Sequence, residues 1–164
     1  MLIEQQITIR EATQQEDSLI AKHFYLMWQD IGVPDHAINS NWLEITLQFI
    51  EQARQSFFYK AFVAEVDDGV VGSASCQLYT GLYPNVFIPE YRKYGYIWGI
   101  YVEPSYRRQG IAKQLTSATV NYFKAVGCTR AVLNASPLGK PVYESLGFSS
   151  SNAMHLDLID ISSF

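Results

Sequence analysis

Two arginines and one glycine lie between an apolar segment and an amphipathic segment. The residues are Arg107-Arg108-Gln109-Gly110-Ile111-Ala112, and the periodic apolar positions after them predict that a helix begins here. The first turn of a helix has amides without intrahelical partners and a partial positive charge, which together favour phosphate. Gly110 has no Cβ, so a backbone amide can approach a ligand closely. The spacing therefore predicts a pyrophosphate-binding loop.

Two common phosphate motifs do not fit this loop. A Walker loop needs a lysine after its last glycine, but Ile111 follows Gly110. The dinucleotide fingerprint needs three glycines in the first strand-to-helix turn, and only one is present. The pattern that remains is Gln/Arg-x-x-Gly-x-Gly/Ala, filled by Arg107, Gly110 and Ala112.

Apolar periodicity and turn residues predict the elements that position this loop. Asp67-Asp68-Gly69 predicts a hairpin between two antiparallel strands, and the nearly continuous apolar run 96–102 predicts a strand buried on both faces. Two later strand–helix–strand crossovers predict parallel pairing. The expected strands span residues 7–10, 58–66, 70–79, 96–102, 131–133 and 154–158, and the expected helices 20–31, 43–50, 111–126 and 141–146. The fold class is α/β (mixed α+β), with helices on both faces of a mixed sheet.

Length and composition limit the protein class. The 164 residues fit one domain, 1–164, and the net charge of −4 argues against nucleic acid as a partner. No apolar run approaches the roughly 20 residues of a membrane span, so no membrane partner is expected. The two cysteines form no disulfide framework or metal motif. Without a signal-peptide pattern in MLIEQQITIR, a cytoplasmic location is expected.

The context of the loop is similar to a known family. The combination YVEPSYRRQGIAKQL … YESLGF resembles the GNAT superfamily of acetyl-CoA-dependent N-acetyltransferases, and the opening ITIREATQQED is similar to how such domains begin. The resemblance implies a GNAT-like sheet whose central strand is partly splayed from its neighbour. It also implies acetyl-CoA as cosubstrate.

The resemblance implies a role for each matching residue. Backbone groups of the strand end would pair with pantetheine, the loop would hold the pyrophosphate, and two residues after the next strand would touch the coenzyme tail. Tyr143 matches the usual general acid, and Arg108 stands where a glycine is frequent. The implied coenzyme-binding residues are Ile100, Tyr101, Val102, Arg107, Arg108, Gln109, Gly110, Ile111, Ala112, Asn134 and Ser136.

The implied reaction is acetyl transfer to a primary amine by direct attack in a ternary complex. A phenol with a pKa near 10 can protonate a leaving thiolate, whose own pKa is about 8–9. Neither cysteine lies in a setting that would activate it as a nucleophile. The acceptor could be a small-molecule amine or a peptide N-terminus, and a homodimer is an expected assembly.

Structural readings of the same residues stay open. Tyr143 could complete a core with its hydroxyl bonded to backbone, and Ser136 could belong only to a turn before Pro137. The domain could bind acyl-CoA as a sensor or assembly partner without transfer activity. A longer or different acyl group is a further alternative.

The general base is not identified by the sequence. The family often uses a carboxylate on the central strand, and 96–102 has none. The other candidates are Glu103, His23, His36, Asp35, Glu65 and His155, or loss of the proton to solvent. Six rings could shape the acceptor site or a subunit interface: Tyr79, Tyr83, Phe87, Tyr91, Tyr94 and Trp98. Asp30, Asp35 and Glu65 could recognise a cationic amine.

Overall fold

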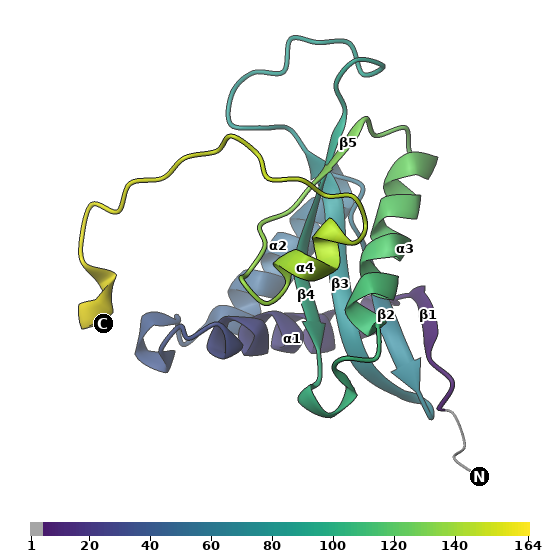
Figure 1. Cartoon of the computed structure of the whole chain (residues 1–164), viewed down its shortest axis with the longest axis vertical. Coiled ribbons are helices and arrows are strands. Elements are labelled where there is room, and N and C mark those ends of the chain that lie inside the picture. Colours follow the sequence, from purple (N-terminus) through teal and green to yellow (C-terminus); the bar gives the residue numbers. More distant parts are fainter. Residues whose placement is uncertain (1–4) are drawn as a thin grey trace.

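The computed structural model describes residues 5–164, so the first four residues of the predicted 1–164 domain lie outside it. Its five-stranded sheet has the order β1-β2-β3-β4-β5, in which only β4 and β5 are parallel (Figure 1). The strands are β1 Thr8–Glu11, β2 Lys60–Val66, β3 Gly69–Tyr79, β4 Tyr94–Val102 and β5 Arg130–Val132. The helices are α1 Asp17–Asp30, α2 Trp42–Ser56, α3 Ile111–Ala125 and α4 Lys140–Glu144. This confirms the predicted mixed α/β class.

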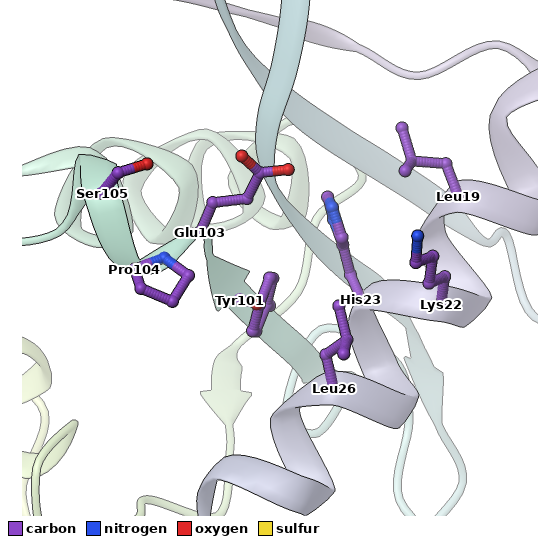
Figure 2. A pocket seen from close by; sticks show the side chains of 8 residues that line it. All are labelled: Leu19, Lys22, His23, Leu26, Tyr101, Glu103, Pro104 and Ser105. Carbon is purple, nitrogen blue, oxygen red and sulfur yellow. The ribbon is translucent and has the colours of Figure 1, made fainter.

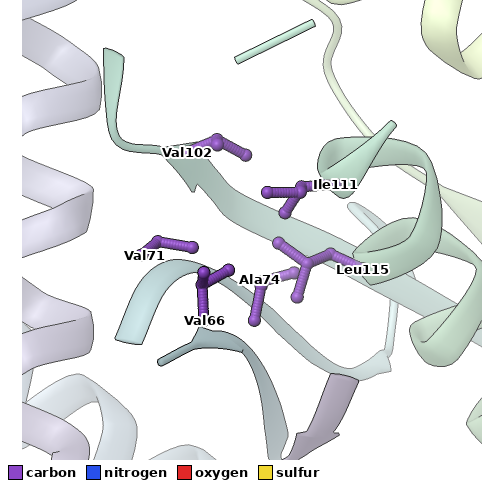
Figure 3. Close-up of a cluster of buried hydrophobic side chains, with 7 residues drawn as sticks. Val66, Val71, Ala74, Val102, Ile111 and Leu115 are labelled. Carbon is purple, nitrogen blue, oxygen red and sulfur yellow. The ribbon is translucent and has the colours of Figure 1, made fainter. Parts of the chain in front are cut away.

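Helices pack on both faces of the sheet, as predicted. On one face, Ile20 of α1 and Ile50 of α2 join a buried cluster with Ala61 of β2. On the other face, Ile111 and Leu115 of α3 pack on β2, β3 and β4 (Figure 3). Small residues of β3 leave room for polar rings under the first face: Ser73 bonds His23 and Ser75 bonds Tyr59.

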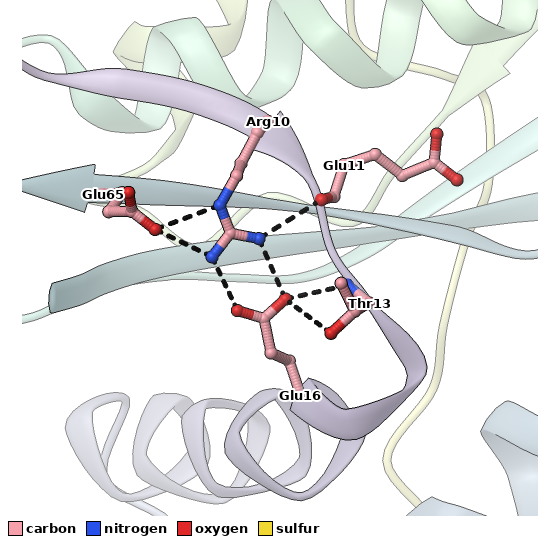
Figure 4. Close-up of polar contacts among 5 residues, drawn as sticks. All are labelled: Arg10, Glu11, Thr13, Glu16 and Glu65. Atoms are coloured by element: carbon pink, nitrogen blue, oxygen red, sulfur yellow. Dashed lines mark hydrogen bonds and ion pairs between the residues drawn. The ribbon is translucent and has the colours of Figure 1, made fainter. Parts of the chain in front are cut away.

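An ion-paired arginine joins the start of α1 to the sheet (Figure 4). The Arg10 guanidinium of β1 donates hydrogen bonds to Glu65 of β2 at 2.8 Å and to Glu16, just before α1, at 2.7 Å. The hydrogen bond from Arg10 lowers the pKa of the Glu16 carboxyl. Glu16 also accepts from the backbone amide of Thr13 at 2.8 Å, so the entry to α1 is held on both sides.

A β-bulge interrupts the register between β3 and β4. Ser75 pairs with Trp98 and Ser73 with Tyr101, so Ala74 faces two residues, Gly99 and Ile100. Gly99 has φ +65°, a left-handed conformation that glycine adopts without strain. On the other side, β4 pairs with β5 only over 94–96. Within the described residues, 97–102 therefore has a free edge, which gives the predicted splay.

The predicted strand at 154–158 is wrong. Residues 149–160 form no helix or strand, and Met154, Leu156 and Leu158 are 95%, 81% and 86% exposed. Alternation of apolar and polar residues makes a strand only where another strand supplies hydrogen bonds, and β5 is three residues long. The second parallel crossover is consequently absent from the part of the chain that the structure describes.

No helix within 5–164 combines the length and the apolar character that crossing a bilayer requires.

Candidate active site

A cavity of about 580 Å³ opens along the free edge of β4. Its floor is residues 96–100 of β4, one wall comes from α1 and α2, and the opposite wall comes from the end of β5, the loop after it and α4. The lining residues are Phe24, Met27, Trp28, Ile31, Ile45, Thr46, Phe49, Tyr96, Ile97, Trp98, Gly99, Ile100, Leu133, Asn134, Ala135, Ser136 and Tyr143. Most of the cavity floor therefore belongs to the part of β4 that β5 leaves unpaired.

Tyr143 lies half-buried on the α4 side of this cavity. Its ring packs edge to face on Phe148, with centroids 6.0 Å apart, and burial raises the pKa of its phenol. Among the described residues, none forms a hydrogen bond with its hydroxyl. The reading in which backbone bonds this hydroxyl therefore has no support in the structure. The phenol faces the cavity protonated at neutral pH, as a general acid must be.

Asn134 and Ser136 line the same wall. The side-chain amide of Asn134 donates to the hydroxyl of Tyr96 at 3.0 Å. The hydroxyl of Ser136 accepts from the amide of Gly139 at 3.2 Å, so Ser136 shapes the turn before α4 and also faces the cavity. The position of Ser136 is therefore compatible with a turn residue and with a residue that contacts the coenzyme tail.

The loop 107–110 is exposed and leads into α3. Gly110 is the N-cap with φ +78°, and no side chain caps this end of the helix. Among the described residues, the amides of Arg108, Gln109 and Gly110 have no hydrogen-bond acceptor. Arg108 itself has φ +61°, the left-handed conformation of the glycine that is frequent there. The loop therefore presents free amides, as an anion site requires.

The remaining predicted coenzyme residues divide between core and surface. Val102 and Ile111 pack in one buried cluster, with Ala112 against it, which places the end of β4 beside the start of α3 (Figure 3). The side chain of Tyr101 lines a different pocket, so only its backbone could serve the free edge of β4. Of the predicted set, the structure brings Ile100, Asn134, Ser136 and Tyr143 into the cavity.

Two candidates for the general base line a second pocket, of about 340 Å³, between α1 and the end of β4 (Figure 2). Figure 2 shows Glu103 and His23 on this pocket, and neither residue lines the cavity that contains Tyr143. His23 is buried and its Nδ1 lies 2.8 Å from the hydroxyl of Ser73. Burial, aided by Lys22, lowers the pKa of His23 to about 4. His23 is therefore a hydrogen-bonded histidine of the core.

The other charged candidates also lie outside the cavity lining. Asp30 pairs with Arg107, Glu65 pairs with Arg10, and Asp35 accepts from Gln29. His36 lies in a short turn after α1, and His155 is in the exposed C-terminal segment.

Most of the six predicted acceptor rings are elsewhere. Three of them, Tyr83, Phe87 and Tyr94, lie around Arg92, whose guanidinium is 4.6 Å from the ring of Tyr94 and 5.1 Å from that of Tyr83. Only Trp98 of the six lines the cavity in the described structure. Sequence reasoning missed Tyr96 of β4 and also three rings on α1 and α2, Phe24, Trp28 and Phe49. The spacing of the three helical rings is that of the apolar face that a helix packs against a core. Only the high number of aromatic residues on these two helices could have indicated a binding site.

Neither cysteine is placed to act as a nucleophile. Cys76 is buried, and desolvation raises the pKa of its thiol to about 12. Burial also raises the pKa of Cys128. Within 5–164, His, Cys, Asp and Glu side chains form no cluster of three that could hold a metal ion.

Comparison with known proteins agrees with this arrangement. The chain is 32% identical to the glucosamine 6-phosphate N-acetyltransferase of Trypanosoma brucei brucei over 106 residues, which are 64% of this chain and 69% of that protein. It is 34% identical to the aminoglycoside N(6')-acetyltransferase type 1 of Salmonella typhimurium over 59 residues, 34% of this chain and 41% of that protein.

Solved structures share the fold. A GCN5-related N-acetyltransferase from Ralstonia eutropha superposes with a TM-score of 0.78 at 22% identity, covering 93% of this chain and 99% of that one. A predicted acetyltransferase with acetyl-CoA from Clostridium acetobutylicum gives 0.77 at 25% identity, covering 93% and 97%. The sequence model of the acetyltransferase (GNAT) family matches residues 19–148. The resemblance predicted from the sequence is therefore confirmed: this chain belongs to the acetyltransferase (GNAT) family.

Proposed function

We propose that this protein transfers an acetyl group from acetyl-CoA to a primary amine by direct attack in a ternary complex. The observation that carries the proposal is the shared cavity: Tyr143 and residues 97–100 on the free edge of β4 line the same space. The family and its relatives support acetyl-CoA as the cosubstrate and an amine as the acceptor.

The coenzyme would bind along two adjoining features. Amides of residues 108–112, before and within the first turn of α3, would hold its pyrophosphate. Backbone groups of Ile100, Tyr101 and Val102 would pair with pantetheine, and Asn134 and Ser136 would contact its tail. The packing of Val102 on Ile111 supports this route, because it joins the strand edge to the loop.

Different groups of the protein would then assist different steps of the transfer. Bound acetyl-CoA supplies an activated thioester carbonyl. Backbone N–H groups on the opened β4 edge would polarise this carbonyl, and Tyr143 would donate the proton that the leaving thiolate needs. In the described structure no carboxylate or imidazole lines the cavity, so the amine would lose its proton to solvent.

Two measurements test the proposal. Coenzyme A at 100 times its Kd should stabilise the fold by about 2.7 kcal/mol, seen as a rise of several degrees in Tm. Free thiol should then appear when acetyl-CoA and an amine are both present. A Tm rise with no thiol release from any amine would favour the non-catalytic sensor, and no Tm rise would contradict the coenzyme site. The cytoplasmic location, the homodimer and the exclusion of nucleic acid stay predictions from the sequence.

A further inference from the structure

One wall of the cavity is built from interlocking aromatic rings. Trp98 lies between Phe24 and Phe49, edge to face with both, at centroid distances of 5.1 and 5.5 Å. Trp28 packs edge to face on Phe24 at 5.8 Å, and the indole N–H of Trp98 donates to Gln77 at 3.1 Å. Because neighbouring rings and this hydrogen bond restrain Trp98, the wall is a preformed aromatic surface.

Several apolar side chains of this wall remain accessible from the cavity. Trp28 is 38% exposed and Phe49 48%, and Ile31 and Ile45 beside them are 48% and 45% exposed. Large apolar side chains gathered in a concave, exposed site are typical of a surface that binds a ligand.

The cavity has no formal charge to offer a ligand. Among the described residues, its lining contains no aspartate, glutamate, lysine, arginine or histidine. Two carboxylates of this region already have partners: Asp30, at the end of α1, pairs with Arg107, and Asp35, in the turn after α1, accepts from Gln29. A phosphate or several ammonium groups would lose water here without a counter-charge, which is unfavourable.

We propose that the acceptor is a primary amine attached by a short chain to an aromatic ring, which rests on Trp98, Phe49 and Trp28. The inference rests on the proposed function and narrows its substrate class. The amine nitrogen forms a bond to the acetyl carbon as the carbon–sulfur bond breaks. The amine's proton goes to solvent, and the thiolate takes its proton from Tyr143. This wall suits neither the phosphosugar nor the aminoglycoside named for the relatives.

The first test compares acceptors by release of free thiol from acetyl-CoA. The kcat/KM for 2-phenylethylamine and tryptamine should exceed that for propylamine, glucosamine 6-phosphate and kanamycin by about 100-fold, because the ring alone contacts the aromatic wall. Equal or better use of glucosamine 6-phosphate or kanamycin would overturn the aromatic acceptor and leave acetyl transfer intact.

A matched pair of variants locates the effect. Phe49→Ala should raise the ratio of KM for 2-phenylethylamine to KM for propylamine about tenfold, because only 2-phenylethylamine has a ring to contact Phe49. Phe87→Ala removes a ring of similar exposure, 45%, which does not line the cavity, and should change neither. Equal effects of the two variants on 2-phenylethylamine would contradict the proposed wall.

Calorimetry separates this inference from the proposed function. Binding of 2-phenylethylamine that Phe49→Ala weakens, without thiol release, would support the acceptor wall and contradict acetyl transfer. Absence of binding to the wild-type protein, with and without coenzyme A, together with no preference in turnover, would overturn the inference.

Discussion

The Nε of Arg107 donates a hydrogen bond of 2.7 Å to the carbonyl oxygen of Val102, the last residue of β4. The same guanidinium pairs with Asp30 of α1 and lies 5.4 Å from the ring centroid of Tyr101. One side chain thus joins the strand end, the first helix and the start of the loop. Arg107 already has a carboxylate partner, so we infer that it positions the loop whose amides would hold the anion.

Arg107→Ala should therefore loosen the loop. Loss of the bond to Val102 and the partly exposed pair with Asp30 should lower the free energy of unfolding by about 1 kcal/mol, measured by urea denaturation. Affinity for coenzyme A should fall as well. Arg108→Ala is the control for stability. It removes the neighbouring positive charge, and alanine and arginine are equally strained in the left-handed backbone conformation of residue 108. A larger loss of stability in Arg108→Ala would contradict the positioning role.

Gly110→Asp should abolish coenzyme A binding. The new carboxylate would stand where the pyrophosphate is proposed to bind, adding bulk and a like charge. Gly127→Asp is a matched control at the other end of α3. Both glycines have φ +78° with open space around a new Cβ, so both variants should lose about 1 kcal/mol through backbone strain. Calorimetry should find binding only in Gly127→Asp, and retained binding in Gly110→Asp would disprove the loop assignment.

Tyr143→Phe should lower kcat by roughly 100-fold and change the Kd for coenzyme A little, because it removes a proton donor and keeps the ring against Phe148. Burial raises the pKa of the Tyr143 phenol, so the donor stays protonated through pH 6–9. The loss should therefore be of similar size across this range in a kcat–pH profile. Unchanged turnover would remove Tyr143 as the acid.

His23 should make the fold less stable in acid. Its pKa is about 4 in the folded protein and about 6.5 in the unfolded chain, so between these values only the unfolded chain takes up the proton. Stability from this group is complete above pH 6.5 and falls by about 3 kcal/mol as pH drops through 4. His23→Gln should flatten the dependence of unfolding free energy on pH in this window. The exposed His155→Gln should not, and equal slopes in wild type and His23→Gln would contradict the assignment.

The sequence determined the local features of this protein. Apolar periodicity places α1, α2 and α3, and Asp67-Asp68-Gly69 places the hairpin. The basic loop together with the later YESLGF identifies the family. These signals are local, because helix starts, turns and loop amides depend on residues a few positions apart.

Tertiary structure decided which residues surround the free edge of β4. Whether residues 154–158 form a strand depends on a partner that no local pattern encodes, and in the described structure they form none. The bulge at Gly99 depends on the register between β3 and β4. The rings of α1 and α2 line a cavity rather than the core because β4 pairs with β5 only over 94–96, which leaves the edge of 97–102 open beside them. Long-range packing, set by residues far apart in the sequence, therefore decides the acceptor side of the site.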